Sequence, residues 1–207
     1  CNFIMSKLET NTIDTVSGNS TLQVGSTNTS TITLGVSGDT INVPSGVTIN
    51  NNGTQTGFGG TNTPNFRAKV TADTTITNNT EVKVIFPSED YDTASAYDTS
   101  NGRFTVPSGQ GGKYLIYSQL FLNSGANSEL TQSRVVLHKN GSGIRSTEND
   151  YSSNNPRRVS LNLITVENLS ASDYLEIYAF AQDTSGSPDL YNNSGNPNFF
   201  GAFKLIE

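Results

Sequence analysis

The sequence predicts an all-β protein: an antiparallel jelly-roll sandwich in the C-terminal part of the chain, preceded by a β-rich stalk. Composition is the first reason. Only 33% of the 207 residues are hydrophobic and 14% are charged, and the many Thr, Gly and Asn residues suit short strands joined by tight turns. Periodicity is the second reason, because apolar residues alternate over short runs between turn residues and no stretch keeps a helical period.

Residues 13–60 read as a stalk built from short units. Each unit offers one or two aliphatic side chains at strand spacing, followed by a turn signal such as Ser37-Gly38-Asp39 or Pro44-Ser45-Gly46. So few aliphatic side chains cannot bury a core within one chain, so the units must stack on each other or on copies from other chains. The irregular spacing favours an intertwined three-chain stalk over a single-chain β-helix, and a disordered linker is the other alternative. The aliphatic residues are Ile13 and Val16, Leu22 and Val24, Ile32, Leu34 and Val36, Ile41 and Val43, and Val47 and Ile49.

Residues 1–12 precede these units, and we interpret them as an attachment segment. Cys1 is the one cysteine of the sequence, which excludes an internal disulfide framework and a multi-cysteine metal site. A lipid on Cys1 is an alternative, although Met5-Ser6-Lys7 looks like an ordinary start.

A second region, residues 61–207, follows the glycine-rich hinge Gly57-Phe58-Gly59-Gly60, and here aromatic and charged residues appear. Asn101-Gly102 and Asn140-Gly141 are dipeptides that favour tight hairpins. Eight strand-like runs between turn signals indicate an antiparallel jelly roll or sandwich. These runs are residues 66–71, 81–86, 103–106, 113–123, 133–139, 158–166, 174–182 and 199–206.

The order of residues in this region carries a family resemblance. Phe86, Asp92, Tyr97 and Phe104 stand in sequence at spacings that resemble the opening signature of the complement C1q globular-head family, a group related to tumour necrosis factor. Gly112-Lys113-Tyr114 supplies the Gly-x-Tyr that this signature expects next, two residues late. Two later stretches are also similar to the family: residues 169–177, with a turn before a late strand, and residues 199–205, which look like its terminal strand. Ile116 and Ser118 depart from the pattern, because the family prefers aromatic residues there.

The resemblance implies a ten-stranded head that forms a homotrimer, with its first and last strands together near the base. A trimeric head would also hold three marginal stalk strands in register. Residues 34–46 of the stalk are themselves similar to repetitive fibre segments of marine tailed bacteriophages.

Together the two resemblances imply a virion fibre or appendage protein on the surface of a bacteriophage particle. Residues 1–12 would bind other virion proteins, the stalk would space the head outward, and the head would bind a host cell-surface glycan or protein. The alternatives are a purely structural capsid or tail decoration protein without a specific ligand, and a secreted bacterial adhesin.

The aromatic residues of the head divide into two groups. Four tyrosines fall in polar loops, which we expect at residues 88–99, 147–156 and 183–197, and loop tyrosines are enriched in recognition surfaces. We therefore expect receptor binding from Tyr91, Tyr97, Tyr151 and Tyr191. Aromatic residues in or beside strands are expected in the core or in trimer packing; these are Phe86, Phe104, Tyr114, Phe180, Phe200 and Phe203.

The sequence offers little catalytic chemistry. His138 is the one histidine, so a catalytic triad or a multi-histidine metal site within one chain is excluded, and we expect no enzyme and nominate no catalytic residue. A depolymerase is a further alternative, for which the sequence nominates no catalytic residues. Glu89, Asp90 and Asp92 could hold calcium through carboxylate oxygens, as the family resemblance allows, with a solvated loop as the alternative.

Charge and hydropathy exclude two further classes of partner. A formal net charge of -6 disfavours nucleic acid, which is bound by clustered Lys and Arg. No run approaches the roughly 18 to 20 apolar residues that cross a bilayer, so we expect no membrane insertion.

Overall fold

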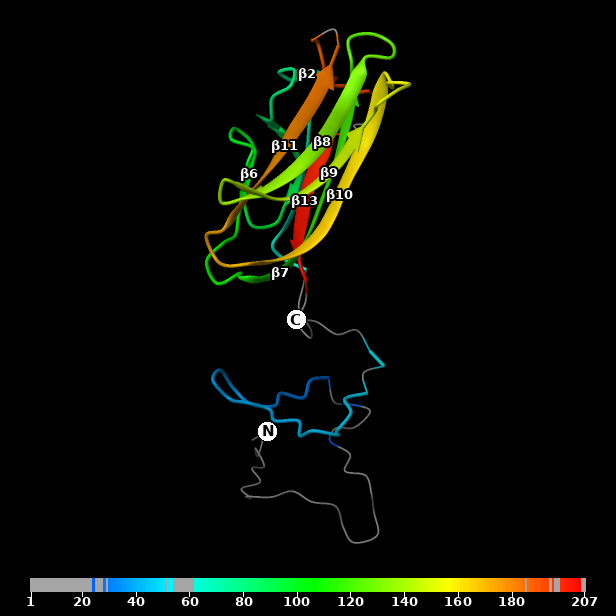
Figure 1. The fold of residues 1–207 in the computed structure, drawn as a ribbon. Helices are drawn as coiled ribbons and strands as arrows, with labels where there is room; N and C mark the ends of the chain where they lie inside the picture. Colours follow the sequence, from blue (N-terminus) through cyan, green and yellow to red (C-terminus); the bar gives the residue numbers. More distant parts are fainter. Residues whose placement is uncertain are drawn as a thin grey trace, which may run out of the picture. The chain divides into compact units, whose positions relative to one another are not determined.

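The structure is a computed structural model that describes residues 24, 28, 30–50, 52–53, 62–184, 186–193, 195 and 198–205. The chain divides into two compact units, Cys1–Gln55 and Thr56–Glu207, shown in Figure 1. Each unit is described by itself. The proposed attachment segment, residues 1–12, lies outside the described residues.

Two turns organise the described part of the first unit, residues 30–50. In one, the Asp39 N–H donates to the Val36 carbonyl oxygen at 3.0 Å, while the Val36 N–H donates to Asp39 Oδ2 at 2.8 Å. In the other, the Val47 N–H donates to the Pro44 carbonyl oxygen at 3.2 Å. Both turns lie where the sequence predicts them.

The predicted stalk strands are absent from residues 30–50 of the single chain. The apolar side chains of this segment are all exposed, from Val43 at 40% to Val36 at 77%. A strand needs a hydrogen-bonded neighbour and a core to cover one face, and the described part of this unit provides neither. The strand prediction therefore fails for one copy alone, and an intertwined three-chain stalk stays a prediction.

The second unit, which we call the head, is a sandwich of two antiparallel sheets. Sheet A has the strand order β2-β12-β7-β13-β1-β4, with β10 paired along the other side of β7. Sheet B has the order β5-β6-β11-β8-β9, with β3 also paired to β11. The strands are β1 (Asn65–Lys69), β2 (Thr74–Thr75), β3 (Val82–Lys83), β4 (Ser88–Asp92), β5 (Tyr97–Asp98), β6 (Arg103–Thr105), β7 (Gly112–Asn123), β8 (Leu130–Lys139), β9 (Ser142–Asp150), β10 (Arg158–Leu169), β11 (Tyr174–Asp183), β12 (Asp189–Leu190) and β13 (Phe199–Lys204).

The first and last strands of the head lie side by side. β1 pairs antiparallel with β13 over its whole length, from Asn65 opposite Phe203 to Lys69 opposite Phe199. This adjacency agrees with what the family resemblance implies for the two ends of the head.

Alternation along each strand places one set of side chains between the sheets. Phe66 is fully buried and its ring stacks on Tyr97 at 4.8 Å and on Phe104 at 4.7 Å, measured between ring centroids. Phe200 meets the Phe66 ring edge-on at 5.0 Å. Burial of a large apolar side chain stabilises a fold by about 1.5–3 kcal/mol, so this aromatic cluster is a principal source of the head's stability.

The hairpin between β8 and β9 turns at Asn140-Gly141, as the sequence predicts. Asn140 has φ 53° and Gly141 has φ 81°, the paired positive angles of a two-residue type I′ turn. Asn140 also ties the turn to the neighbouring strand, because its side-chain oxygen accepts the Tyr174 N–H at 2.9 Å. Asn101-Gly102 instead ends a longer loop between β5 and β6, in which the Gly102 N–H donates to the Asp98 carbonyl oxygen at 2.8 Å.

All three predicted polar loops contain strand residues. Residues 88–92 and 97–98 of the first loop form β4 and β5, residues 147–150 of the second belong to β9, and residues 189–190 of the third form β12. β4 and β9 are edge strands of their sheets, and an edge strand can carry polar residues on both faces because water or charged neighbours cover it. The sequence prediction of loops there is therefore wrong.

Candidate functional site

The outer face of sheet A is aromatic and apolar. Core residues of β7 and β13 such as Tyr114, Ile116 and Phe200 point inward, so the residues between them point outward. We call this surface the aromatic face. It consists of Tyr91 on β4, Leu115 and Tyr117 on β7, Ile164 and Val166 on β10, and Phe199 and Phe203 on β13.

Tyr117 lies at the centre of the aromatic face, opposite Gly201. A Cβ atom at position 201 would overlap the Tyr117 ring and would lie 2.8 Å from the Phe66 carbonyl oxygen, so only glycine lets the ring lie over β13. The Tyr117 hydroxyl then reaches the Tyr91 hydroxyl at 3.0 Å. Burial raises the pKa of Tyr117 above its usual range, with a further contribution from this hydrogen bond.

Phe199 and Phe203 flank the Tyr117 ring, with centroid separations of 6.1 Å and 6.5 Å. The Arg67 guanidinium lies 4.6 Å from the centroid of the Phe199 ring and pairs with Asp90 at 3.4 Å. The centre of this face is thus a layer of rings with one paired, partly exposed cation against it.

The two edges of the aromatic face differ in shape. On β10, Ile164 is 72% exposed and Val166 is 48% exposed, and both project from the edge of the sheet. On the opposite edge, a hollow of about 200 Å³ is lined by Asn62, Asn65, Tyr91 and Phe203. The same face therefore carries a projecting apolar edge and a hollowed aromatic edge.

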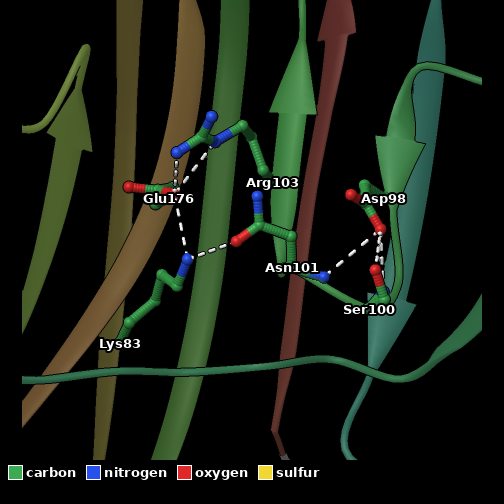
Figure 2. Close-up of polar contacts among 6 residues, drawn as sticks. All are labelled: Lys83, Asp98, Ser100, Asn101, Arg103 and Glu176. Atoms are coloured by element: carbon green, nitrogen blue, oxygen red, sulfur yellow. Dashed lines mark hydrogen bonds and ion pairs between the residues drawn. The ribbon is translucent and has the colours of Figure 1, made fainter.

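The outer face of sheet B is charged. Glu176 on β11 is 2% exposed, and its Oε1 accepts from Arg103 Nε at 3.0 Å and from Lys83 Nζ at 3.2 Å. Figure 2 shows both cations reaching this oxygen from β6 and β3. Arg103 also lies over the Tyr174 ring, 3.8 Å from its centroid.

The same cluster fixes the loop before β6. Lys83 Nζ donates to Asn101 Oδ1 at 2.5 Å, and Asp98 Oδ1 accepts the Ser100 hydroxyl at 2.6 Å, as Figure 2 shows. The Ser100 hydroxyl and backbone N–H hold the pKa of Asp98 below its usual value. Because every member of this cluster has a protein partner, its role is to position the loop against sheet B.

A second charged group surrounds His138 on β8. Its Nε2 lies 2.8 Å from Glu81 Oε1, and its ring stacks on Tyr178 with centroids 3.9 Å apart. Arg134 lies between two carboxylates, with Nη2 3.3 Å from Glu81 and Nη1 3.3 Å from Glu148. The histidine thus joins a surface network of charged side chains.

The four tyrosines predicted to bind a receptor are not brought together. Tyr97 is 6% exposed and packs in the core, where burial raises its pKa; its burial contradicts the prediction of surface contact. Tyr151 packs against the core from the edge of sheet B. Tyr191 lies beneath the Arg158 guanidinium at 3.8 Å, and Tyr91 belongs to the aromatic face.

Two of the three predicted calcium residues, Asp90 and Asp92, have protein partners. Asp90 forms ion pairs with Lys69 and, at 3.4 Å, with Arg67. Asp92 Oδ2 accepts the Tyr97 N–H at 2.8 Å, and Glu89 alternates to the other face of β4. Within the described parts of the chain, no group of three or more acidic, histidine or cysteine side chains could hold a metal ion.

The six aromatic residues predicted to pack divide between the core and the outer faces. Phe86, Phe104, Tyr114 and Phe200 are fully buried. Phe203 lies on the aromatic face, and Phe180 lies on the outer face of sheet B beneath the Arg134 guanidinium, at 4.8 Å. Burial raises the pKa of Tyr114 to about 12, in keeping with its place between the sheets.

Most of the aromatic face, including Tyr117, Phe199 and Ile164, is not among the site residues that the sequence predicts. A signal was present, because residues 114–117 and 199–200 are unbroken apolar runs. Strands that are apolar on both faces are normally covered on both faces. In the described structure only the inner face of these strands is covered, by sheet B.

Comparison with solved structures places the fold. No protein-family model matches the sequence, and no curated protein matches it either. Among solved structures, Eiger TNF from S. frugiperda has a TM-score of 0.51 at 15% identity, covering 69% of this chain and 91% of that chain. Murine APRIL at pH 5.0 has a TM-score of 0.50 at 16% identity, covering 68% and 98%. The globular domain of zebrafish complement 1qA has a TM-score of 0.45 at 16% identity, covering 68% and 93%.

The head therefore has a jelly-roll fold of the tumour-necrosis-factor type, and the predicted fold class is confirmed. The resemblance of the stalk to phage fibres stays a prediction. Of the described residues, none forms a helix long and apolar enough to cross a membrane.

Proposed function

We propose that this chain is a non-enzymatic binding protein that assembles into a homotrimer through the aromatic face of the head. The observation that carries the proposal is the contrast between the two outer faces, one apolar and one charged. Exposed apolar patches of this kind on soluble domains mark interaction surfaces. The partner that fits this face best is another copy of the same chain, because the face has both a projecting apolar edge and a hollow that could receive such an edge.

The two halves lie at opposite edges of the aromatic face. Ile164 and Val166 project from β10, and the hollow beside Tyr91 and Phe203 lies near β4 and β1. Contact between the projecting edge of one copy and the hollow of the next joins unlike surfaces, and such contacts form a ring when the rotation from copy to copy closes. The C1q-like order of sequence features supports three copies, because that family forms homotrimers.

The stalk supports the same symmetry. Its described residues expose their aliphatic side chains in a single copy, which supports burial against partner chains. We propose that the stalks of three copies pair with one another, and that residues 1–12 attach the assembly to a bacteriophage particle as a virion fibre or appendage. The loops of the head and sheet B would then face the host cell surface. Weak contacts there gain strength from multivalency.

The test of self-association is the mass of the full chain by light scattering. We expect three times the chain mass of 22.1 kDa. Ile164→Asp buries a charge in the interface and should give a folded monomer. The matched control is Asn162→Asp, since Asn162 is an exposed polar position two residues earlier on β10. A wild-type monomer, or an Ile164→Asp trimer, would contradict the proposed interface.

The fibre role has its own test. Antibodies raised against the head should label projections on intact phage particles by immunogold electron microscopy. Label restricted to cell debris or secreted material would contradict the virion role and would leave the homotrimer in place.

A further inference from the structure

A pocket of about 370 Å³ lies on the outer face of sheet B, between β8 and β9. Its lining comprises Glu81, Arg134, Val136 and residues 143–146. Small-molecule sites usually have volumes of roughly 300–1,000 Å³, so this pocket suits a small ligand or one unit of a larger one. It lies on the sheet opposite to the aromatic face.

The apolar part of the pocket is small and is kept open by a glycine. Val136, which is 7% exposed, lies at the floor beside Gly143, and Ile144 lines the pocket while packing against the core. A Cβ atom at Gly143 would lie 3.3 Å from Val136 Cγ1 and 3.4 Å from His138 Nε2, and any larger side chain there would cover both. The pocket therefore combines an apolar floor with polar walls.

The polar walls contain charges that are already compensated. Glu81 faces both His138 Nε2 at 2.8 Å and Arg134 Nη2 at 3.3 Å. Arg134 also pairs with Glu148 at 3.3 Å, and Arg145 Nε pairs with Glu167 Oε1 at 2.8 Å. An anionic ligand would be repelled by these carboxylates, and a cationic ligand would be repelled by the arginines.

A neutral ligand with several hydroxyl groups meets no such conflict. The carboxylate oxygens of Glu81 and the five N–H groups of Arg134 have more hydrogen-bonding capacity than their ion pairs use. A hydroxyl can donate to the first and accept from the second, and hydrogen bonds to charged groups are the stronger ones. The C–H face of a sugar ring fits the apolar floor.

We propose that this pocket binds one unit of a neutral saccharide. The inference deepens the proposed function, because assembly through the aromatic face leaves sheet B exposed as the surface that meets a glycan. Glu81 and Arg134 would supply paired acceptors and donors, and Ser146 a further hydroxyl at the rim.

The experiment uses the full chain and saturation-transfer NMR with defined probes. These are the methyl glycosides of glucose, galactose, mannose and N-acetylglucosamine, with galacturonate and N-acetylneuraminate as acidic probes. At least one neutral glycoside should bind, and the acidic probes should bind more weakly. Absence of binding by every neutral glycoside, or binding of the acidic probes alone, overturns the proposal.

Three variants locate the site. Ser146→Phe fills the pocket from an exposed strand position where an aromatic residue is well tolerated, and it should abolish the signal. Ser142→Phe makes the same change on the same strand outside the lining and should retain it. Glu81→Gln keeps the shape and removes the charge, and should weaken binding about tenfold. Binding that Ser146→Phe leaves intact would overturn the assignment.

Light scattering on the same samples separates this inference from the proposed function. A trimer that binds no neutral glycoside removes the saccharide pocket alone. A monomer that binds one, with loss in Ser146→Phe, keeps the pocket and removes the proposed assembly.

Discussion

At the scale of single residues, Tyr117 and Gly201 determine the shape of the aromatic face together. The Tyr117 ring lies over Gly201, and its hydroxyl reaches Tyr91 on the far edge of the sheet. Neither residue contributes to the hydrophobic core in the way that Phe66 or Phe200 does. Their arrangement instead determines which side-chain surfaces the aromatic face exposes to a partner.

Gly201→Ala should therefore weaken assembly more than it weakens folding. The added methyl group displaces the Tyr117 ring and crowds the Phe66 carbonyl, so the flat centre of the face is lost. We expect a shift from trimer towards monomer in sedimentation velocity. Gly143→Ala is the control, because position 143 lies on sheet B, and it should leave the trimer unchanged.

Loss of Glu176 should cost more stability than loss of an exposed ion pair on sheet B. Glu176→Ala leaves Arg103 and Lys83 without their shared carboxylate, and we expect a loss of about 2–4 kcal/mol in the free energy of unfolding. Urea denaturation measures this loss. Glu148→Ala removes the exposed ion pair with Arg134 and should cost less than about 1 kcal/mol. Equal losses in the two variants would contradict the expectation that the buried carboxylate contributes more.

Asp173 should make stability depend on pH in the acid range. The Lys139 ammonium, the Asn140 side chain and the Ser170 N–H lower its pKa to about 2, below the usual value of about 3.9 for an unfolded chain. A lowered carboxyl pKa stabilises the fold above the unfolded value, and this contribution is lost as pH falls from about 4 to about 2. Urea midpoints measured across this range should fall less steeply in Asp173→Asn than in the wild type.

At the scale of elements, the sequence predicts strands well where one face is buried. All eight predicted runs contain a strand, although residues 81–86 contribute only the two residues of β3. β4 and β9 escaped prediction because Ser, Asp, Glu and Asn fill both of their faces. Their strand structure comes from pairing with β1 and β8, which local sequence does not encode.

The candidate site could be predicted only in part, because the direction of its side chains also depends on strand pairing. Tyr97 follows polar residues and was interpreted as a loop tyrosine, but the chain turns it onto Phe66. Ile164 and Val166 look like core residues of a strand, and only the sheet order shows that they lie on an outer edge. Side-chain direction at an edge depends on tertiary pairing, which periodicity cannot reveal.

The two units of the chain should differ in whether each folds without the rest of the chain. The head buries its own core, whereas the described stalk residues form two turns and expose their aliphatic side chains. We expect residues 56–207 alone to keep the β-sheet circular dichroism spectrum and the cooperative melting of the full chain. Residues 1–55 alone should show no cooperative transition; an independently melting stalk fragment would support a single-chain β-helix instead.

At the scale of the whole molecule, the trimer should be insensitive to chelators and to salt. Asp90 and Asp92 already have protein partners, and screening weakens contacts between exposed charges rather than apolar ones. Light scattering in EDTA, and separately in about 1 M NaCl, should return the same mass. Dissociation in EDTA would place a metal in the assembly, and dissociation in salt would show that ion pairs hold it together.

The hydrogen-bonded tyrosine pair has a practical consequence. The protein contains no tryptophan and eight tyrosines, so its near-ultraviolet circular dichroism comes largely from tyrosine. That signal reports fixed side-chain packing, and Tyr91 and Tyr117 sit on the surface that we expect another copy to cover. Dilution should therefore change the near-ultraviolet spectrum while the far-ultraviolet spectrum stays constant, so the protein carries an intrinsic optical probe of its own assembly.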